Sequence, residues 1–279
     1  MGRIYEALQR SNTEKEGPGS VAPEFVVSPE ITGSADSDTV DLDLARPLTV
    51  AATPEDRLVI LAGQRSLGAE KIRILAARLR KLQDQSPIKK LLITSTVKDE
   101  GKTVLSTNVA VALAKTRQRV LLIDGDCHQA NAARILGANG SPGLADWWHS
   151  EGAIQSYLMR VNGLPLWFLP AGGPVEHPGE MLQSGRLSDQ INTMSGWFDW
   201  VIIDSPPSAP LADAAVWGSM ADAILLVARE GKTPRRLLRK VVDSLDNKKL
   251  LGIVLNDCSD PDQHYYTNYY NLQHAHRPG

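Results

Sequence analysis

Cysteine, aromatic residues, long apolar stretches and an excess of one charge are all scarce in this sequence of 279 residues. Its two cysteines, Cys127 and Cys258, are too few for a disulfide framework. No apolar stretch approaches the about 18 residues of a membrane span and no leader pattern is visible, so we expect a chain that neither spans a membrane nor is secreted. A net charge of −2 argues against a protein that coats nucleic acid, and no nucleic acid partner is expected.

The composition that remains is that of a globular protein with polar ends. An apolar content of 42% suffices to bury one substantial core. Residues 2–11 match a short amphipathic helix, whereas residues 12–45 are rich in Ser, Gly, Pro, Thr and acids and show no period. We therefore predict an N-terminal helix with a flexible linker over 1–45, a folded domain over 46–257, and a flexible tail over 258–279.

The most informative stretch is residues 91–126, LLITSTVKDEGKTVLSTNVAVALAKTRQRVLLIDGD. An apolar run leads into a tight loop ending in Glu100-Gly101-Lys102-Thr103, and a helical pattern follows. Strand, loop and helix in this order are typical of a phosphate-binding loop, whose backbone N–H groups surround phosphate oxygens. Lys102 would reach the β- and γ-phosphates of ATP, and the Thr103 hydroxyl would bind Mg²⁺. Thr96 stands where such loops usually begin with Gly or Ala.

Three carboxylates, Asp124, Asp126 and Asp204, close apolar runs that match buried parallel strands. In an open α/β sheet, ligands bind at the carboxyl ends of the strands. Asp204 is therefore predicted beside Thr103, where it could hold Mg²⁺ directly or through water. The alternative for Asp204 is a turn residue that merely ends its strand before two prolines.

Further apolar runs alternate with helix-length segments along the chain. The predicted strands cover 91–93, 120–123, 166–169, 200–203, 223–228 and 250–255. A helix is predicted over 68–84, with Ile72, Leu75, Leu79 and Leu82 on its apolar face. This alternation predicts an α/β fold with a doubly wound, mostly parallel sheet and helices on both faces.

Two polar features near the end of the predicted domain have both a structural and a functional interpretation. Asn256, which follows the last strand, is a candidate contact for the adenine base, with a role in the turn as the alternative. Arg235, Arg236, Arg239 and Lys240 crowd one predicted helix. Such a run is usually a solvated face, and a docking site for an acidic segment or for phosphotyrosines is the alternative.

Four of the six tyrosines of the chain gather near its end, in the stretch HYYTNYYN. They are Tyr265, Tyr266, Tyr269 and Tyr270. With almost no aliphatic residue around them, they cannot form a core, so we expect an exposed segment. The structural interpretation is a sticky tail or a segment that docks on a partner. The functional interpretation is a cluster of phosphate acceptors.

Taken together, these features resemble the bacterial tyrosine autokinases (BY-kinases) of exopolysaccharide and capsule synthesis, of the CpsD/CapB type. The resemblance rests on the order and spacing of the three nucleotide motifs and on the tyrosine tail, and it covers nearly the whole chain. Shorter matching pieces are Gly143-Leu144-Ala145-Asp146, Pro170-Ala171-Gly172-Gly173 and Pro178-Gly179-Glu180-Met181-Leu182. The resemblance implies a P-loop NTPase fold of the deviant Walker, MinD-like type and an ATP- and Mg²⁺-dependent protein-tyrosine kinase.

The resemblance also implies roles and partners. Lys102, Asp124 and Asp126 would be catalytic. Asp126 would hold Mg²⁺ together with Thr103 and Asp204, directly or through water, and Asp124 would orient or deprotonate the incoming tyrosine hydroxyl. The four tail tyrosines would be the phosphoacceptors. Glu100, Gly101 and Asn256 would contact the nucleotide together with the lysine and threonine of the loop. The kinase would regulate exopolysaccharide synthesis or export with a membrane chain-length determinant as activator. It would form a homo-oligomer, be opposed by a tyrosine phosphatase, and be cytoplasmic, held at the inner face of the membrane through its partner.

Three departures from the family pattern stand out. Lys98-Asp99 replaces a Pro-Gly pair before the Glu-Gly-Lys of the loop. His128 and Ala130 stand where the family has Arg and Pro, so an expected basic group is replaced by one that is mostly neutral at pH 7. Ala76 occupies the third position of the family's oligomerisation helix, where Arg is usual.

Two other functions stay open at this point. The first is an ATPase switch of the MinD/ParA kind, which cycles on DNA or membranes without phosphorylating protein. Switches of this kind carry a lysine five residues before Lys102, where this chain has Val97, with Lys98 one place away. The second is a catalytically weak scaffold of the same fold, which the departures at His128 and Ala130 would suit.

Overall fold

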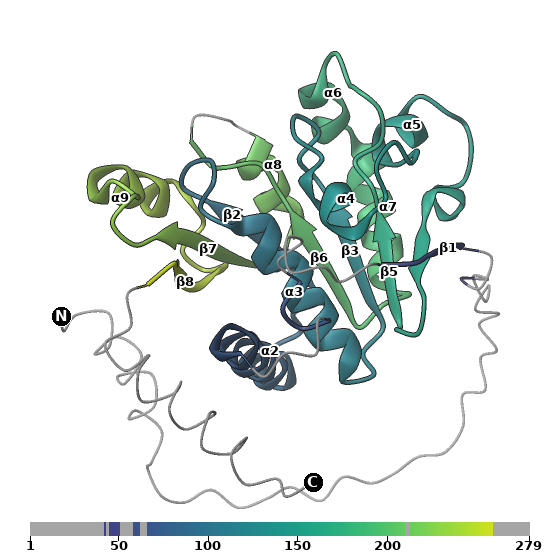
Figure 1. The fold of residues 1–279 in the computed structure, drawn as a ribbon. Helices are drawn as coiled ribbons and strands as arrows, with labels where there is room; N and C mark the ends of the chain where they lie inside the picture. Colours follow the sequence, from purple (N-terminus) through teal and green to yellow (C-terminus); the bar gives the residue numbers. More distant parts are fainter. Residues whose placement is uncertain (1–41, 43–44, 51–57, 62–65, 210–212, 259–279) are drawn as a thin grey trace, which may run out of the picture. The chain divides into compact units, whose positions relative to one another are not determined.

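The computed structural model describes residues 42, 45–50, 58–61, 66–209 and 213–258 (Figure 1). The predicted helix at 2–11, most of the linker and all four tail tyrosines, Tyr265, Tyr266, Tyr269 and Tyr270, lie outside the described residues. Those predictions and the three-part division of the chain stay predictions. Within the described ranges, no helix combines the length and the apolar character needed to cross a bilayer.

The strands are β1 (Arg46–Leu48), β2 (Lys90–Ser95), β3 (Val120–Asp124), β4 (Met159–Val161), β5 (Leu166–Leu169), β6 (Trp200–Asp204), β7 (Ala223–Arg229) and β8 (Leu250–Asn256). The helices are α2 (Leu67–Gln85), α3 (Lys102–Lys115), α4 (Asn131–Leu136), α5 (Leu144–Trp148), α6 (Pro178–Gln183), α7 (Gly185–Ser195), α8 (Asp213–Met220) and α9 (Arg235–Ser244), with a 3-10 turn at Ile154–Tyr157.

The described strands form one sheet in the order β1-β4-β5-β3-β6-β2-β7-β8. The six predicted strands are β5, β3, β6, β2, β7 and β8, and they pair with one another in parallel, which confirms the mostly parallel sheet. The strands β1 and β4, which extend one edge, were not predicted from the sequence; β4 is antiparallel to β5 and parallel to β1. Both have only three residues. Pro47 suits the edge strand β1 because proline cannot donate to a ladder.

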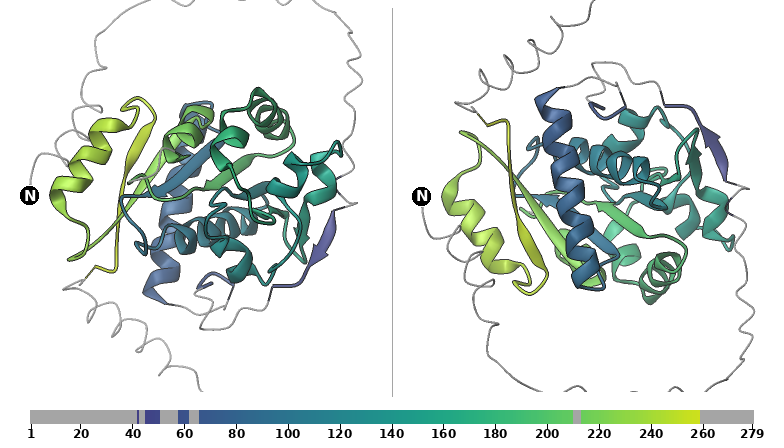
Figure 2. Two further views of the ribbon diagram at one scale, coloured as in Figure 1. Left: turned by 90° about the horizontal axis from the view of Figure 1, so that it is seen from above. Right: turned by 90° about the horizontal axis from the view of Figure 1, so that it is seen from below.

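Helices cover both faces of the sheet (Figure 2). Alternate residues along the strands supply the two cores: Leu91 and Ile93 pack with α2, α3 and α4, whereas Leu92 packs with α5 to α9. Strands buried on both faces read as continuous apolar runs, which is why they were recognisable in the sequence. The predicted doubly wound fold is confirmed.

Helix α3 is the central helix of its face, and nearly all of its 14 residues are buried, because the sheet lies on one side and α2 on the other. The helix predicted over 68–84 is α2, and its contact line is carried by Ala69, Ala76 and Leu79. Leu82, predicted on the apolar face, is 38% exposed. The small side chains of Ala69 and Ala76 let α2 approach α3 closely, so the buried stripe on α2 is narrower than the leucine spacing predicted.

Candidate active site

The loop between β2 and α3 has the backbone form of a phosphate-binding loop. Gly101 caps α3 with a left-handed φ of 93°. A Cβ added there would lie 2.2 Å from Asn256 Nδ2, so only glycine fits. Thr96, at the start of the loop, is fully buried, and its Oγ1 has no hydrogen-bond partner among the described residues. The side chain of Thr96, which is larger than the usual Gly or Ala, is therefore buried in the fold and does not point into the predicted phosphate site.

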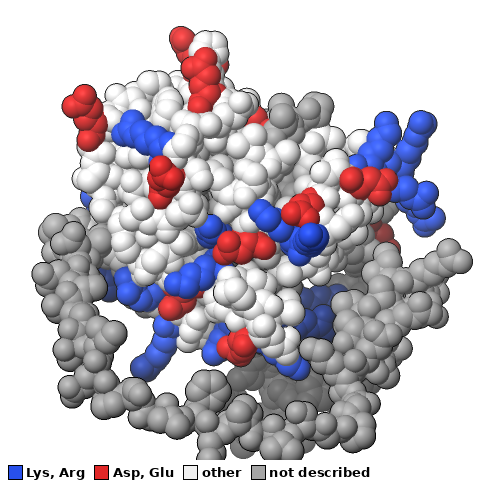
Figure 3. Space-filling model, turned by 180° about the vertical axis from the view of Figure 1, so that it is seen from behind, with Lys and Arg blue, Asp and Glu red and all other residues white. Residues whose placement is uncertain are grey.

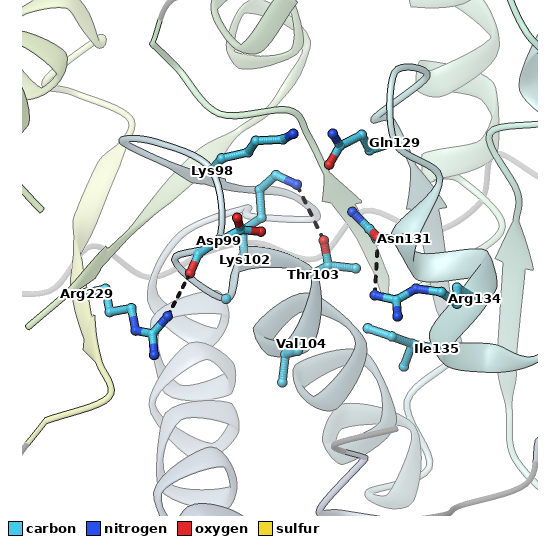
Figure 4. A pocket seen from close by; sticks show the side chains of 11 residues that line it. Lys98, Asp99, Lys102, Thr103, Val104, Gln129, Asn131, Arg134, Ile135 and Arg229 are labelled. Carbon is cyan, nitrogen blue, oxygen red and sulfur yellow. Dashed lines mark hydrogen bonds between the residues drawn. The ribbon is translucent and has the colours of Figure 1, made fainter. Parts of the chain in front are cut away.

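The first turn of α3 opens onto a cavity of about 430 Å³ (Figure 4). Its walls come from three elements that are far apart in the sequence: the loop with the first turn of α3, the loop and start of α4, and the end of β7. They include Lys98, Asp99, Gly101, Lys102, Thr103, Gln129, Asn131, Arg134 and Arg229. This is the edge of the sheet at which the sequence predicted a nucleotide.

Three carboxylates converge beside this cavity because of strand register. Asp124 and Asp204 are direct partners in the parallel ladder between β3 and β6, and Asp126 follows two residues after the first of them. All three are almost fully buried, with exposed fractions of 0%, 0% and 3%. So much negative charge in the interior requires a compensating cation.

Lys102 supplies that cation. Its Nζ lies 3.0 Å from Asp126 Oδ2 and 3.4 Å from Thr103 Oγ1. Burial disfavours the ammonium, but the charges of Asp204 and then of Asp126 more than offset this, so the pKa of Lys102 is raised above its ordinary value. The lysine is therefore charged at any physiological pH and is held next to the loop where phosphates would sit.

Asp204 is bound on one oxygen only. Oδ1 accepts from Ser106 Oγ at 2.9 Å, whereas Oδ2 is buried without a hydrogen-bond partner among the described residues. Burial raises the pKa of Asp204 to about 6, against the opposing effects of Lys102, Thr103 and Ser106. A buried carboxylate oxygen without a partner is costly unless something binds it. Ser106, one turn into α3, was not predicted from the sequence.

The residues present fit Mg²⁺. Thr103, Asp126 and Asp204 offer hard oxygen atoms, and the free Oδ2 of Asp204 is a ready ligand. Within the described residues, no group of three or more His, Cys, Asp or Glu side chains forms a cage for a metal. Such a site suits Mg²⁺, which usually takes one or two carboxylates and completes its shell with water and substrate phosphates.

Asp124 is placed differently from the other two carboxylates. Its Oδ2 accepts from the backbone N–H groups of Ala132 and Ala133 at the start of α4, and its Oδ1 accepts from that of Asp126. Burial, and then the charge of Asp204, raise its pKa well above the ordinary value despite these donors. The side chain thus holds the loop between β3 and α4, and its predicted part in orienting a tyrosine hydroxyl stays a prediction.

The two residues after Asp126 differ in their surroundings. Cys127 packs against the core on the α5 to α9 face, and burial raises the pKa of its thiol to about 12, so the thiol stays protonated. His128, which replaces the family's arginine, lies with Nε2 2.9 Å from Asp213 Oδ2 at the start of α8. The replacement is thus tied to a carboxylate of a neighbouring helix.

We expect Asp204→Asn to reduce Mg²⁺-dependent turnover by at least about a hundredfold without destabilising the metal-free chain. Because the folded chain holds the pKa of Asp204 near 6, against 3.8 ordinarily, ionising it in the fold costs stability. This cost is absent below about pH 4, grows as the pH rises, and reaches roughly 3 kcal/mol above about pH 6. The asparagine does not ionise, so the variant does not lose this stability.

Thermal unfolding of the wild-type chain and of Asp204→Asn without Mg²⁺ checks this expectation between about pH 4 and pH 8. The variant should gain stability relative to the wild-type chain as the pH rises through this window. An equal loss of stability and of turnover at neutral pH would instead assign Asp204 a structural role only.

Contacts far apart in sequence brace the phosphate loop, and sequence analysis missed most of them. The buried Glu100 side chain accepts from the N–H of Val97 at 2.9 Å and forms a short hydrogen bond with Thr233 Oγ1, in the loop before α9. Asn256 Nδ2 donates to the Glu100 carbonyl at 2.9 Å. Arg229 Nη1 donates to the Asp99 carbonyl at 3.3 Å (Figure 4).

These bonds change the interpretation of two predicted nucleotide contacts. The Glu100 carboxylate and the Asn256 amide both hold the loop in shape, and Asn256 does so across 156 positions of the sequence, not within its own turn. A contact of Asn256 with the adenine base stays a prediction. Thr233 and Arg229 belong to no recognisable sequence motif. Side chains that brace a loop from another element follow no local pattern, so they could not be predicted from the sequence.

Thr233→Val should raise the KM for ATP about tenfold with a smaller effect on kcat, because the loop loses its tie to Glu100 while the phosphate ligands remain. Thr233→Ser restores the hydroxyl and should return KM to within about twofold of the wild-type value. Steady-state kinetics of both variants at saturating Mg²⁺ test this, and an unchanged KM in the valine variant would remove Thr233 from the positioning of the loop.

Comparison with known proteins gives concordant matches. Residues 93–233 match a family model described as an AAA domain. The tyrosine-protein kinase CpsD of Streptococcus agalactiae is 31% identical over 184 residues, which cover 64% of this chain and 80% of that protein. The kinase domain of the Escherichia coli tyrosine kinase ETK superposes with a TM-score of 0.67 at 23% identity, covering 75% of this chain and 88% of that domain, and so shares the fold.

Other relatives are much longer. The succinoglycan biosynthesis transport protein ExoP of Rhizobium meliloti is 29% identical over 230 residues, which cover 76% of this chain. The chain spans only 29% of the length of that protein. The match to ExoP therefore concerns one part of a larger molecule, whereas the match to CpsD covers most of a protein of similar size.

Proposed function

Because the chain belongs to the bacterial tyrosine kinases of the CpsD type, we propose that it is an ATP-dependent tyrosine autokinase that phosphorylates its own tail. The observation that carries this proposal is the arrangement of Lys102 and Thr103, which line the cavity under a phosphate-loop backbone, with the buried carboxylates of Asp126 and Asp204 beside them. A phosphoryl-transfer site needs little more than this, since alignment and charge neutralisation supply most of the catalysis.

In this proposal the loop residues bind the triphosphate. Backbone N–H groups of the loop and the first turn of α3 surround the phosphate oxygens, and Lys102 moves its ammonium from Asp126 toward the β- and γ-phosphates. Thr103, Asp126 and Asp204 would hold Mg²⁺, which neutralises charge on the phosphates when bound. Glu100 and Thr233 keep the loop in the geometry that aligns the reacting groups.

The acceptors in this proposal are Tyr265, Tyr266, Tyr269 and Tyr270, whose hydroxyl oxygen attacks the γ-phosphorus while ADP leaves. Asp124 or Asp126 accepts or orients the hydroxyl proton. The raised pKa of Asp124 would strengthen it as a base once ionised. Asp126 lies nearer the cavity, since its Oδ2 contacts Lys102, which lines it.

The biological setting is proposed from the relatives. The name of ExoP ties that protein to the biosynthesis and transport of an exopolysaccharide. By analogy, we infer that this chain regulates exopolysaccharide synthesis or export together with a membrane chain-length determinant, which activates it and keeps it at the inner face of the membrane. Assembly into a homo-oligomer and reversal by a tyrosine phosphatase complete the proposal.

The test is direct. Purified full-length chain is incubated with Mg-ATP, alone and with cytoplasmic segments of candidate membrane activators, and phosphotyrosine is measured by antibody and located by mass spectrometry. Phosphotyrosine in residues 265–270 supports the proposal. ATP hydrolysis without phosphotyrosine under every condition would favour the ATPase switch, and neither activity would favour the scaffold.

A further inference from the structure

Helix α9 carries a basic face that the proposed active site does not use. Arg235, Arg236, Arg239 and Lys240 of the helix and Lys232 in the loop before it are all exposed and recur at intervals of three and four residues, and we call the five the α9 basic face. The opposite side of the helix packs against the core through Leu238, Val241 and Leu245. In Figure 3, Lys and Arg side chains protrude together at the upper right of the view, at the end of the molecule where α9 lies.

The charges of this face are not explained by the stability of the helix. Among the residues that the structure describes, none of the five side chains makes a hydrogen bond or an ion pair. Arg235 and Arg236 stand in the first turn, where the helix macrodipole disfavours cations, and that turn has no acidic residue. Five unpaired cations on one surface attract an anionic partner.

The start of the tail lies beside this face. The Asn256 carbonyl accepts from the N–H of Glu230, five residues before α9 begins, and Arg229 Nε donates to Asp257 Oδ2 at 2.8 Å. From Asn256 to Tyr265–Tyr270 there are about nine to fourteen residues, which reach at most roughly 30–50 Å. A helix of 10 residues is only about 15 Å long. The tail can therefore reach every residue of the α9 basic face of its own chain.

We propose that the α9 basic face binds the phosphorylated tail of the same chain, through phosphate groups on Tyr265, Tyr266, Tyr269 and Tyr270. Four phosphotyrosines carry about −6 to −8 charges against five cations. Three of the five cations are arginines, whose planar fork binds a phosphate with two parallel hydrogen bonds. A short tether gives the tail an effective concentration in the millimolar range, so even a weak site is filled in preference to free anions.

The consequence is regulation of the proposed active site. A phosphorylated tail that is bound to α9 of its own chain cannot enter the cavity of a neighbouring molecule. Each chain therefore keeps its phosphorylated tail away from the active sites of its neighbours. The same helix begins next to Thr233, which braces the phosphate loop through Glu100. This inference rests on the proposed phosphorylation of the tail for its role, but the binding itself is a property of the surface and can be measured without any kinase activity.

The experiment measures binding of a labelled synthetic peptide, residues 259–279 with phosphate on all four tyrosines, by fluorescence anisotropy. The protein is the full chain with its four tail tyrosines changed to Phe, in excess Mg-ADP so that the phosphate loop is occupied. We expect Arg235→Glu, Arg236→Glu and Arg239→Glu together to weaken binding at least about tenfold at low salt. The peptide without phosphate should bind the parent chain at least about tenfold more weakly.

The matched control changes Arg78, Arg80 and Lys81 to Glu on the exposed side of α2, which alters the net charge by the same amount. All these positions are exposed, so thermal unfolding should stay close to that of the parent chain in both triple variants. Equal weakening in the α2 control, or equal binding of the unphosphorylated peptide, would overturn the proposal. Binding to vesicles of phosphatidylcholine and phosphatidylserine is measured as well. If the α9 variant loses vesicle binding but keeps phosphopeptide binding, the surface binds lipid and the proposal is overturned.

Discussion

Lys102→Ala should abolish detectable binding of Mg-ATP and lower turnover by at least about a thousandfold. Lys102 stands in the first turn of α3, is only 8% exposed, and lines the cavity from inside. Lys98 belongs to the same loop and lines the same cavity but is exposed. Lys98→Ala is therefore the matched control, and we expect it to change affinity by no more than a few fold. Titration calorimetry with Mg-ATP measures both variants.

The same change should also affect folding, in a way that depends on pH. Lys102 lowers the pKa of Asp204, so its removal leaves buried carboxylates without their cation and moves the protonation of Asp204 to higher pH. The variant should therefore be least stable relative to the wild-type chain above about pH 7 and recover toward about pH 5, where the carboxyl is neutral. Calorimetry is done where circular dichroism shows the variant folded. Wild-type affinity for Mg-ATP under those conditions would show that the phosphate-loop assignment is wrong.

The parts of the fold that could be predicted are those in which burial requires a continuous run of apolar residues in the sequence. Central strands such as Leu91–Ile93 and Val201–Ile203 are covered on both faces, so every residue is apolar and the run is visible without an alignment. The strands β1 and β4 are three residues long and each contains one exposed arginine, so nothing separates them from loops. These strands form because β4 can pair with the free edge of β5 and β1 with β4, and no local sequence pattern indicates this pairing.

The candidate site shows the same division. Lys102, Thr103 and Asp204 were predictable because a strand, a loop and a helix in fixed order force them to one edge of the sheet. The tie between Glu100 and Thr233 joins residues 133 positions apart and depends on how the loop before α9 folds back. Asp124 illustrates a third case: its position was predicted, but two of its three backbone donors come from the start of α4, and its raised pKa comes from burial and then from the charge of Asp204.

The tail is expected to be phosphorylated between molecules. Mixing a Lys102→Ala chain, which cannot use ATP, with a wild-type catalyst and Mg-ATP should place phosphate on the tail of the inactive chain, because the tail reaches at most roughly 30–50 Å beyond Asn256 and so can enter a neighbour's cavity. Changing Tyr265, Tyr266, Tyr269 and Tyr270 to Phe in the inactive chain should remove most of this label. Mass spectrometry of a size-tagged acceptor measures both outcomes, and Asp204→Asn serves as a second inactive acceptor if the lysine variant folds poorly.

The tyrosine changes separate a phosphoacceptor from a structural tail. The four Phe changes placed in the catalyst itself should leave its ATP hydrolysis unchanged, since the proposed ligands of Mg-ATP, Lys102, Thr103, Asp126 and Asp204, all lie outside the tail in the sequence. Four phosphates would add about −6 to −8 charges to one short segment, so modified neighbours repel each other and an assembly loosens as it reacts. Labelling should accordingly slow as the tails fill. Label that persists at full strength after all four changes, or none in the presence of an activating partner, would exclude tail autophosphorylation and leave the ATPase switch or the scaffold.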